Sequence, residues 1–134
     1  MNRKWIFSGK TEDLASLREE VRAFLVDTNI EDDVSAAIVL GIDEACTNII
    51  RHAYNGESRP FRIEMRRMRN RLRFILRDYG SPCERPKIQS RDLDEVRPGG
   101  LGVHIIQQVF EHVEYSPQAH GTRLTLEKRI SAKT

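Results

Sequence analysis

The spacing of apolar residues changes from a helical to a strand pattern near the middle of this chain, and this change constrains the fold more than any other feature. Before it, apolar residues recur every three or four positions, which predicts a helix from about Glu31 to Tyr54. Asn55-Gly56 then has the composition of a turn. Beyond it, apolar and polar residues alternate, as in strands with one buried face. A helix stripe and a sheet face must each be buried, so we expect the two to pack together.

Two strands joined by a hairpin are predicted after this turn, with Arg69-Asn70 at the hairpin. Their inward positions are Phe61, Ile63, Met65, Leu72, Phe74 and Leu76. Asp78 continues the inward phase of the second strand. A carboxylate on the core side costs free energy unless it meets a partner or a ligand, so Asp78 is a candidate site residue.

The remaining elements complete the predicted topology. We expect a strand at 4–8, an amphipathic helix ending near residue 27, a helix at 101–113 and closing strands at 113–116 and 122–129. Consecutive strands pair as hairpins, so the predicted fold class is α+β. It is a two-layer sandwich in which helices cover one face of a mainly antiparallel sheet.

Length and composition predict one soluble domain spanning residues 1–134, since 39% of its 134 residues are hydrophobic. No apolar run approaches the ~20 residues of a membrane span, and the N-terminus lacks the apolar core of a signal peptide. We therefore expect a cytoplasmic protein that does not enter a membrane. The polar, proline-containing stretch 81–98 is predicted to form a loop or lid.

Glu44 and Asn48 are candidate site residues on the predicted second helix. They are four residues apart and therefore share one helix face. Magnesium takes few protein ligands and keeps several waters, so the neutral oxygen of Asn48 could supply one ligand. Glu44 could orient or deprotonate an attacking hydroxyl group or water. An ordinary polar helix face is the commoner explanation of this spacing alone.

Three further motifs are each weak alone. Asp78-Tyr79-Gly80 ends a strand, where the carboxylate could accept a hydrogen bond from an exocyclic amine such as that of adenine. Gly99–Gly102 would let the backbone approach phosphates at a helix N-terminus, which favours anions. Thr122, which follows Gly121, could hydrogen-bond a base or a buried water. Ordinary turns and strand residues would explain each motif separately.

Taken in this order and spacing, the four motifs resemble the GHKL-type ATP-binding fold shared by DNA gyrases and sensor histidine kinases. Within that superfamily the chain is most similar to the small bacterial anti-sigma-factor serine/threonine-protein kinases. The resemblance covers nearly the whole chain, and its most specific part is Glu-x-x-x-Asn-x-x-x-His-Ala-Tyr at residues 44–54. The second motif, Asp-Tyr-Gly-Ser-Pro, departs from the Asp-x-Gly-x-Gly of many relatives but is similar to that of many small anti-sigma kinases.

The resemblance implies a role for each matching residue. Glu44 would be the catalytic general base, Asn48 the magnesium ligand and Asp78 the anchor of adenine. The residues it implies for binding ATP and Mg²⁺ are Asn48, His52, Asp78, Gly80, Arg97, Gly100, Leu101, Gly102 and Thr122. The implied reaction transfers the γ-phosphoryl group of ATP to a serine or threonine of a small partner protein.

The resemblance also implies partners. These are an anti-sigma-factor antagonist, which would be phosphorylated, and a sigma factor, which would be held inactive. A homodimer through the apolar stripe of the first helix is a further expectation, unless that stripe packs on the sheet. A non-catalytic module that binds nucleotide or a sigma factor is the alternative function.

Arginines cluster on the two predicted hairpin strands. Eight arginines lie between Arg59 and Arg77, with Glu64 as the one acidic residue. Those expected on the outer sheet face or its edge are Arg62, Arg66, Arg71, Arg73 and Arg77. They form either a solvated face or a docking patch for an acidic protein surface. A nucleic-acid-binding module is disfavoured, because the outward positions of these strands offer no Phe or Tyr for base stacking.

Overall fold

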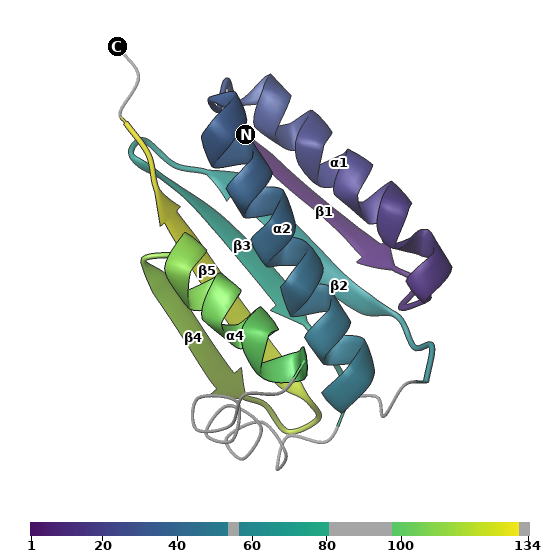
Figure 1. The fold of residues 1–134 in the computed structure, drawn as a ribbon. Helices are drawn as coiled ribbons and strands as arrows, with labels where there is room; N and C mark the ends of the chain where they lie inside the picture. The colour runs from purple at the N-terminus through teal and green to yellow at the C-terminus, as the bar shows by residue number, and fades with distance from the viewer. Residues whose placement is uncertain (54–56, 81–97, 132–134) are drawn as a thin grey trace.

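The computed structural model describes residues 1–53, 57–80 and 98–131. Its elements are β1 (Asn2–Phe7), a 3-10 turn η1 (Thr11–Asp13), α1 (Leu14–Asp27), α2 (Asp32–Asn48), a π-helical turn η2 (Ile49–Ala53), β2 (Phe61–Arg67), β3 (Arg71–Arg77), α4 (Pro98–Val109), β4 (His112–Pro117) and β5 (Thr122–Arg129). The strands of the described part form one five-stranded sheet in the order β1-β2-β3-β5-β4 (Figure 1).

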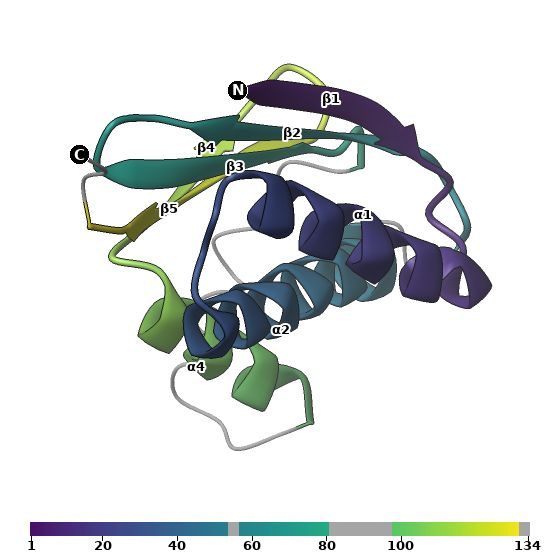
Figure 2. The same cartoon turned by 90° about the horizontal axis from the view of Figure 1, so that it is seen from above.

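All neighbouring strands of this sheet are antiparallel. Helices α1, α2 and α4 lie on the same side of the sheet, and the opposite face carries no helix of the described part (Figure 2). The predicted α+β sandwich with helices on one face is therefore confirmed. None of the described helices is long and apolar enough to cross a bilayer.

The core lies between the sheet and the helices, as the alternation of β2 and β3 predicted. Phe74 of β3 is fully buried at its centre. Its ring makes edge-to-face contacts with Phe24 of α1, at 6.3 Å between centroids, and with Phe110, at 5.9 Å. Such aromatic pairs contribute beyond the area they bury. The three rings tie both outer helices to the central strand.

The apolar stripe of α1 packs into this core. Its inward residues Leu17, Val21, Phe24 and Leu25 are each at most 1% exposed. A stripe buried within its own chain is not available to a second copy. The expectation that it forms a homodimer contact is therefore wrong, and the alternative, packing against the sheet, holds.

Three predicted helix boundaries are also wrong. Helix α4 begins at Pro98 rather than at 101 and ends at Val109 rather than at 113. Phe110 and Val113 continue the helical spacing in sequence, but Phe110 is buried just beyond the helix and Val113 belongs to β4. The second helix was expected to continue to residue 54, whereas α2 ends at Asn48 and passes into η2. Residue 54 lies outside the described residues.

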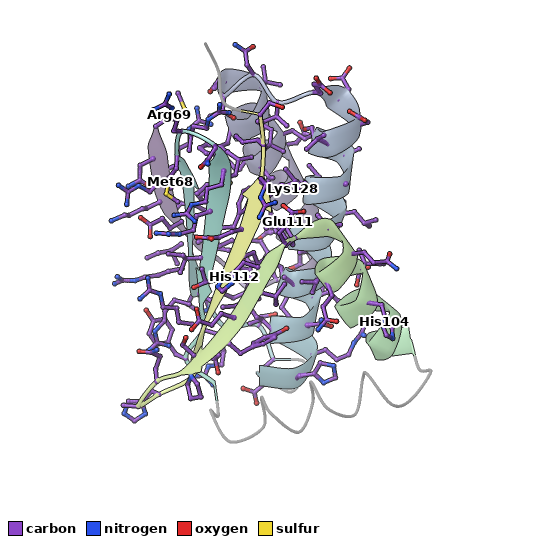
Figure 3. All side chains as sticks on the ribbon, turned by 90° about the vertical axis from the view of Figure 1, so that its left-hand side faces the viewer. Met68, Arg69, His104, Glu111, His112 and Lys128 are labelled. Atoms are coloured by element: carbon purple, nitrogen blue, oxygen red, sulfur yellow. The ribbon has the colours of Figure 1, made fainter. Side chains whose placement is uncertain are left out.

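The junction between α4 and β4 is fixed by Glu111, which lies beside Lys128 of β5 (Figure 3). Its carboxylate accepts hydrogen bonds from Lys128 Nζ at 3.2 Å and from the backbone N–H of Arg129. Desolvation alone would raise the pKa of Glu111, but these donors and the two positive charges outweigh it and lower the pKa. The ionised carboxylate thus holds the start of β4 against β5.

Candidate functional site

The predicted site residues come from segments that meet at one end of the molecule. The carboxyl end of α2, the end of β3, the start of β5 and the first turn of α4 all lie there (Figure 1). The register of the sheet brings two of these segments together, because Arg77 of β3 pairs with Arg123 of β5. Asp78 and Thr122, the neighbours of this pair in sequence, therefore lie side by side.

Asp78 occupies the inward position that the strand phase predicted, and it is only 1% exposed. Its Oδ1 accepts a hydrogen bond from the backbone N–H of Gly80 at 3.1 Å. Its own N–H donates to the carbonyl of Thr122 at 3.0 Å. The carboxylate is thus held in a fixed orientation by the backbone on either side of it. Gly80 itself is buried.

Gly121 is a structural requirement of the site to which sequence reasoning gave no role. Its φ is +86°, a conformation that L residues rarely adopt. A Cβ atom at this position would lie 2.1 Å from the carbonyl oxygen of Asp78. The β4–β5 turn can approach the end of β3 only because no side chain intervenes. A glycine directly before Thr122 was the available sequence signal.

Arg77 contacts the backbone around Asp78 and Gly121 from the other face of the sheet. One of its guanidinium nitrogens donates to the carbonyl oxygen of His120 at 2.8 Å and to that of Asp78. Its charge also lies 4.5 Å from the centre of the Tyr79 ring, within cation–π range. Sequence reasoning placed Arg77 on the outer face but missed its contacts with the site backbone.

Asn48 and Thr122 bring two unsatisfied oxygens to this end of the molecule. Asn48 is 5% exposed and Thr122 is fully buried. In the described part of the chain, neither Oδ1 of Asn48 nor Oγ1 of Thr122 has a hydrogen-bond partner. Leaving a buried polar atom unpaired costs about 1–3 kcal/mol. Two such atoms at one end of a fold are what a polar ligand or metal site requires.

The helical side of the site contains Glu44 and His52. Glu44 lies one turn before Asn48 on α2 and is half-buried. His52, also half-buried, lies on the π-helical turn η2. Such turns are rare and occur frequently at functional sites. The π geometry also changes the phase after Asn48, so His52 does not simply continue the α-helical face of Glu44 and Asn48.

The first turn of α4 contains Pro98, Gly99 and Gly100, followed by Leu101 and Gly102. These glycines therefore lie within the helix, not in a turn that precedes it. Proline at the first helical position is favourable because the missing N–H has no intrahelical partner there. The free N–H groups of a helix start attract anions. Arg97 and nearly all of the predicted lid, 81–97, lie outside the described residues.

Gly41 sets the distance between α2 and α4. A Cβ atom on Gly41 would lie 2.7 Å from Cε2 of Phe110 and 3.4 Å from Cγ1 of Val109. The absence of a side chain lets the two helices run close together. The end of α2 and the start of α4 consequently face the same site.

The helices, strand ends and turns of this α+β domain thus converge on one polar end. The chain belongs to the family of histidine kinase-like ATPase domains, whose sequence profile matches residues 7–128. The resemblance to this ATP-binding superfamily, inferred from four short motifs, is confirmed. The two unsatisfied oxygens of Asn48 and Thr122 at the polar end are consistent with the binding of a polar ligand such as ATP.

Similar proteins include several named kinases. The serine-protein kinase RsbW of Bacillus velezensis is 24% identical over 111 residues, which cover 76% of this chain and 68% of that protein. RsbW of Bacillus pumilus is 28% identical over 86 residues, and the match covers 56% of this chain and 53% of that protein. The serine/threonine-protein kinase BtrW of Bordetella bronchiseptica is 27% identical over 94 residues, 66% of each chain.

A solved structure shares the fold. The crystal structure of the RsbU and RsbW domains of Rv1364c from Mycobacterium tuberculosis superposes with a TM-score of 0.71 at 16% identity. The similarity covers all of this chain and 33% of that chain. At this low identity the similarity shows that the two chains share the α+β fold, and it shows nothing further.

We expect Gly121→Ala to destabilise the fold by about 3 kcal/mol, because the substitution adds both an unfavourable φ and a backbone clash with Asp78. For a domain of this size the thermal midpoint should fall by about 10 °C, which calorimetry would measure. His120→Ala is the matched control, since only the backbone of His120 contacts Arg77. Equal midpoints for the two variants would contradict the close approach of the turn to β3.

Proposed function

We propose that this domain is an ATP-dependent serine/threonine-protein kinase that acts as an anti-sigma regulatory factor. The observation that carries the proposal is the pair of buried, unpartnered oxygens of Asn48 and Thr122 at the end of the fold where Asp78 is buried. The kinase names of similar proteins support the same reaction class.

Asp78 and Thr122 form the base-binding side of the proposed site. The Asp78 carboxylate already accepts one backbone hydrogen bond and has further acceptor capacity for the exocyclic amine of adenine. The Thr122 hydroxyl can donate to a ring nitrogen of the base or to a water beside it.

Asn48 would hold Mg²⁺ through Oδ1, and its chemistry fits that ion. Magnesium prefers oxygen ligands, needs few of them from protein and shares the phosphates of a nucleotide. When bound, the ion neutralises charge that develops on the transferred phosphoryl group. The phosphates themselves would lie against the N-terminal turn of α4, and residues 81–98 would close over them as a lid.

Glu44 would act as the general base. It lies one turn from Asn48 on the same helix, and a half-buried carboxylate can accept the proton of an attacking serine or threonine hydroxyl. Most of the catalytic effect in phosphoryl transfer comes from positioning and charge neutralisation. The rigid end of α2, anchored by buried Ile49 and Ile50, supplies that positioning.

The partners we propose are an anti-sigma-factor antagonist as phosphoacceptor and a sigma factor as the sequestered protein. A phosphoryl group adds nearly two negative charges to the antagonist and can therefore break its docking surface. Release of one partner would then allow capture of the other.

Magnesium-ATP should raise the thermal midpoint of the wild-type protein by on the order of 5–15 °C, since saturating ligand adds ~2.7 kcal/mol at a hundred times its dissociation constant. Asp78→Asn should abolish the increase, because the amide can still accept from Gly80 but presents a donor to the adenine amine. Differential scanning fluorimetry measures both. The control is Asp33→Asn, a substitution of an exposed residue. An undiminished shift of the midpoint in Asp78→Asn would refute the role of Asp78 in binding adenine.

Asn48→Leu should have two opposite effects. Without ligand the variant should be more stable by about 1 kcal/mol, because the unpaired buried oxygen is gone. The part of the ATP-induced stabilisation that requires magnesium should disappear, whereas Asn48→Asp should retain it. Melting curves recorded without ligand, in ATP with magnesium and in ATP with EDTA separate the change in intrinsic stability from the magnesium-dependent stabilisation. A magnesium-dependent increment that persists in Asn48→Leu would exclude Asn48 as a ligand.

Glu44→Gln should lower phosphoryl transfer about a hundredfold, as expected on loss of a general base. Transfer is measured from γ-labelled ATP to a purified anti-sigma-factor antagonist of the same organism. The stabilisation by magnesium-ATP should not change, and Glu31→Gln, at the exposed start of α2, should behave as wild type. Wild-type rates in Glu44→Gln would exclude Glu44 as the base. No transfer by the wild type would favour a non-catalytic nucleotide-binding module.

A further inference from the structure

The face of the sheet opposite the helices has a row of three arginines in direct register. Arg62 of β2 pairs with Arg77 of β3, and Arg77 pairs with Arg123 of β5. Neighbouring strands lie about 4.8 Å apart, so the three side chains start close together. Like charges directly opposite each other on a sheet are destabilising. We call these three residues the arginine row.

Acidic side chains pair with three other cations of this face, Lys4, Arg71 and Arg73, but not with the arginine row. Lys4 lies 3.7 Å from Glu64, and Glu127 pairs with Arg73 at 2.6 Å and with Arg71 at 3.4 Å. Within residues 1–53, 57–80 and 98–131, neither Arg62 nor Arg123 has an acidic partner. The arginine row therefore gathers three positive charges in direct register at one end of the open face. Side chains with nitrogen ends extend from this side of the sheet in Figure 3.

The three arginines of the row line a hollow of about 730 Å³. Its lining residues are Lys4, Trp5, Ile6, Arg62, Ile63, Glu64, Ile75, Arg77, Tyr79, Gln118 and Arg123. Ile6 of β1 is 65% exposed, and the half-buried Ile75 lies on the same face of β3, which β2 separates from β1. The hollow thus combines excess positive charge with exposed apolar surface, a combination typical of protein-binding surfaces.

Arg77 is held in place before any partner binds. Its guanidinium donates to the His120 carbonyl and lies over the Tyr79 ring. A planar guanidinium has five donors, so these contacts leave others for a ligand. Binding to a side chain that is already ordered loses less conformational entropy.

We propose that the arginine row and its hollow dock an acidic segment of a partner protein that carries an apolar side chain. Carboxylates of the segment would pair with Arg62, Arg77 and Arg123. Its apolar side chain would lie against the exposed Ile6, which pairs with Arg62 across β1 and β2. This surface faces away from the helices and operates without nucleotide.

Two other occupants fit the face less well. A nucleic acid needs a continuous basic track and aromatic rings for stacking. Here Glu64, Glu114 and Glu127 interrupt the track, and the Tyr79 ring is covered by the Arg77 guanidinium. A second copy of the chain joined by a two-fold axis at the row would set arginine against arginine.

The test measures the binding of a short fluorescein-labelled peptide, rich in glutamate with one central leucine, by fluorescence anisotropy. Arg62→Gln combined with Arg123→Gln should weaken binding about tenfold. The matched control is Arg66→Gln with Arg129→Gln, which removes the same charge from the same face. Arg66 lies four residues from Arg62 on β2, about 13 Å away, beyond the ~8 Å Debye length at physiological salt. The control should change affinity less than about twofold.

Four outcomes would overturn the proposal. These are no peptide binding, equal binding of a peptide with glutamine in place of glutamate, equal losses in the two double variants, and tighter binding of a single-stranded oligonucleotide of the same charge. A wild-type dimer in sedimentation velocity that dissociates in the Arg62→Gln/Arg123→Gln variant would assign the face to a second copy instead. Far-ultraviolet circular dichroism confirms the fold of each variant, so the peptide result can be interpreted even if ATP stabilises none of these proteins.

Discussion

Burial of one carboxylate at the end of β3 is the constraint on which the candidate site depends. Asp78 continues the inward phase of a core strand, so the chain must provide polar groups where it would otherwise place an apolar residue. Two of these groups belong to the backbone: the N–H of Gly80 donates to the carboxylate, and the carbonyl of Thr122 accepts from the Asp78 N–H. Gly121 allows this approach because it has no side chain. The backbone thus fixes the acid at the end of the strand.

The sequence predicted those parts of the site that follow from a simple period. Alternation along β3 was enough to place Asp78 on the core side, and helical spacing was enough to put Glu44 and Asn48 on one face. Both depend on local backbone geometry, which the side-chain pattern reports directly. The layer arrangement followed as well, because a one-sided helix and a one-sided sheet can bury their apolar faces only against each other.

Features that depend on contacts distant in sequence could not be predicted in the same way. The helical spacing of Phe110 and Val113 extends beyond α4, since both residues point to the core from a helix end and from a strand. The π-helical turn after Asn48 changes the phase without a change in composition. The need for glycine at 121 is visible only when the Asp78 carbonyl is seen 2.1 Å from where a Cβ would lie. The positive φ of Gly121 is required by the contact of this turn with β3, and the sequence around residue 121 does not reveal that contact.

The two surfaces we propose are joined at consecutive residues of one strand. Successive side chains of a strand point to opposite faces, so Arg77 lies on the open face and Asp78 on the core side. Arg77 also donates to the carbonyl of Asp78 and to that of His120, two residues before Thr122. The arginine that would meet an acidic partner is therefore the one that supports the backbone of the proposed adenine site. Both carbonyls accept from one nitrogen of the guanidinium, so a partner's carboxylate would bind the donors on the other two nitrogens, and the backbone contacts would persist when the partner docks.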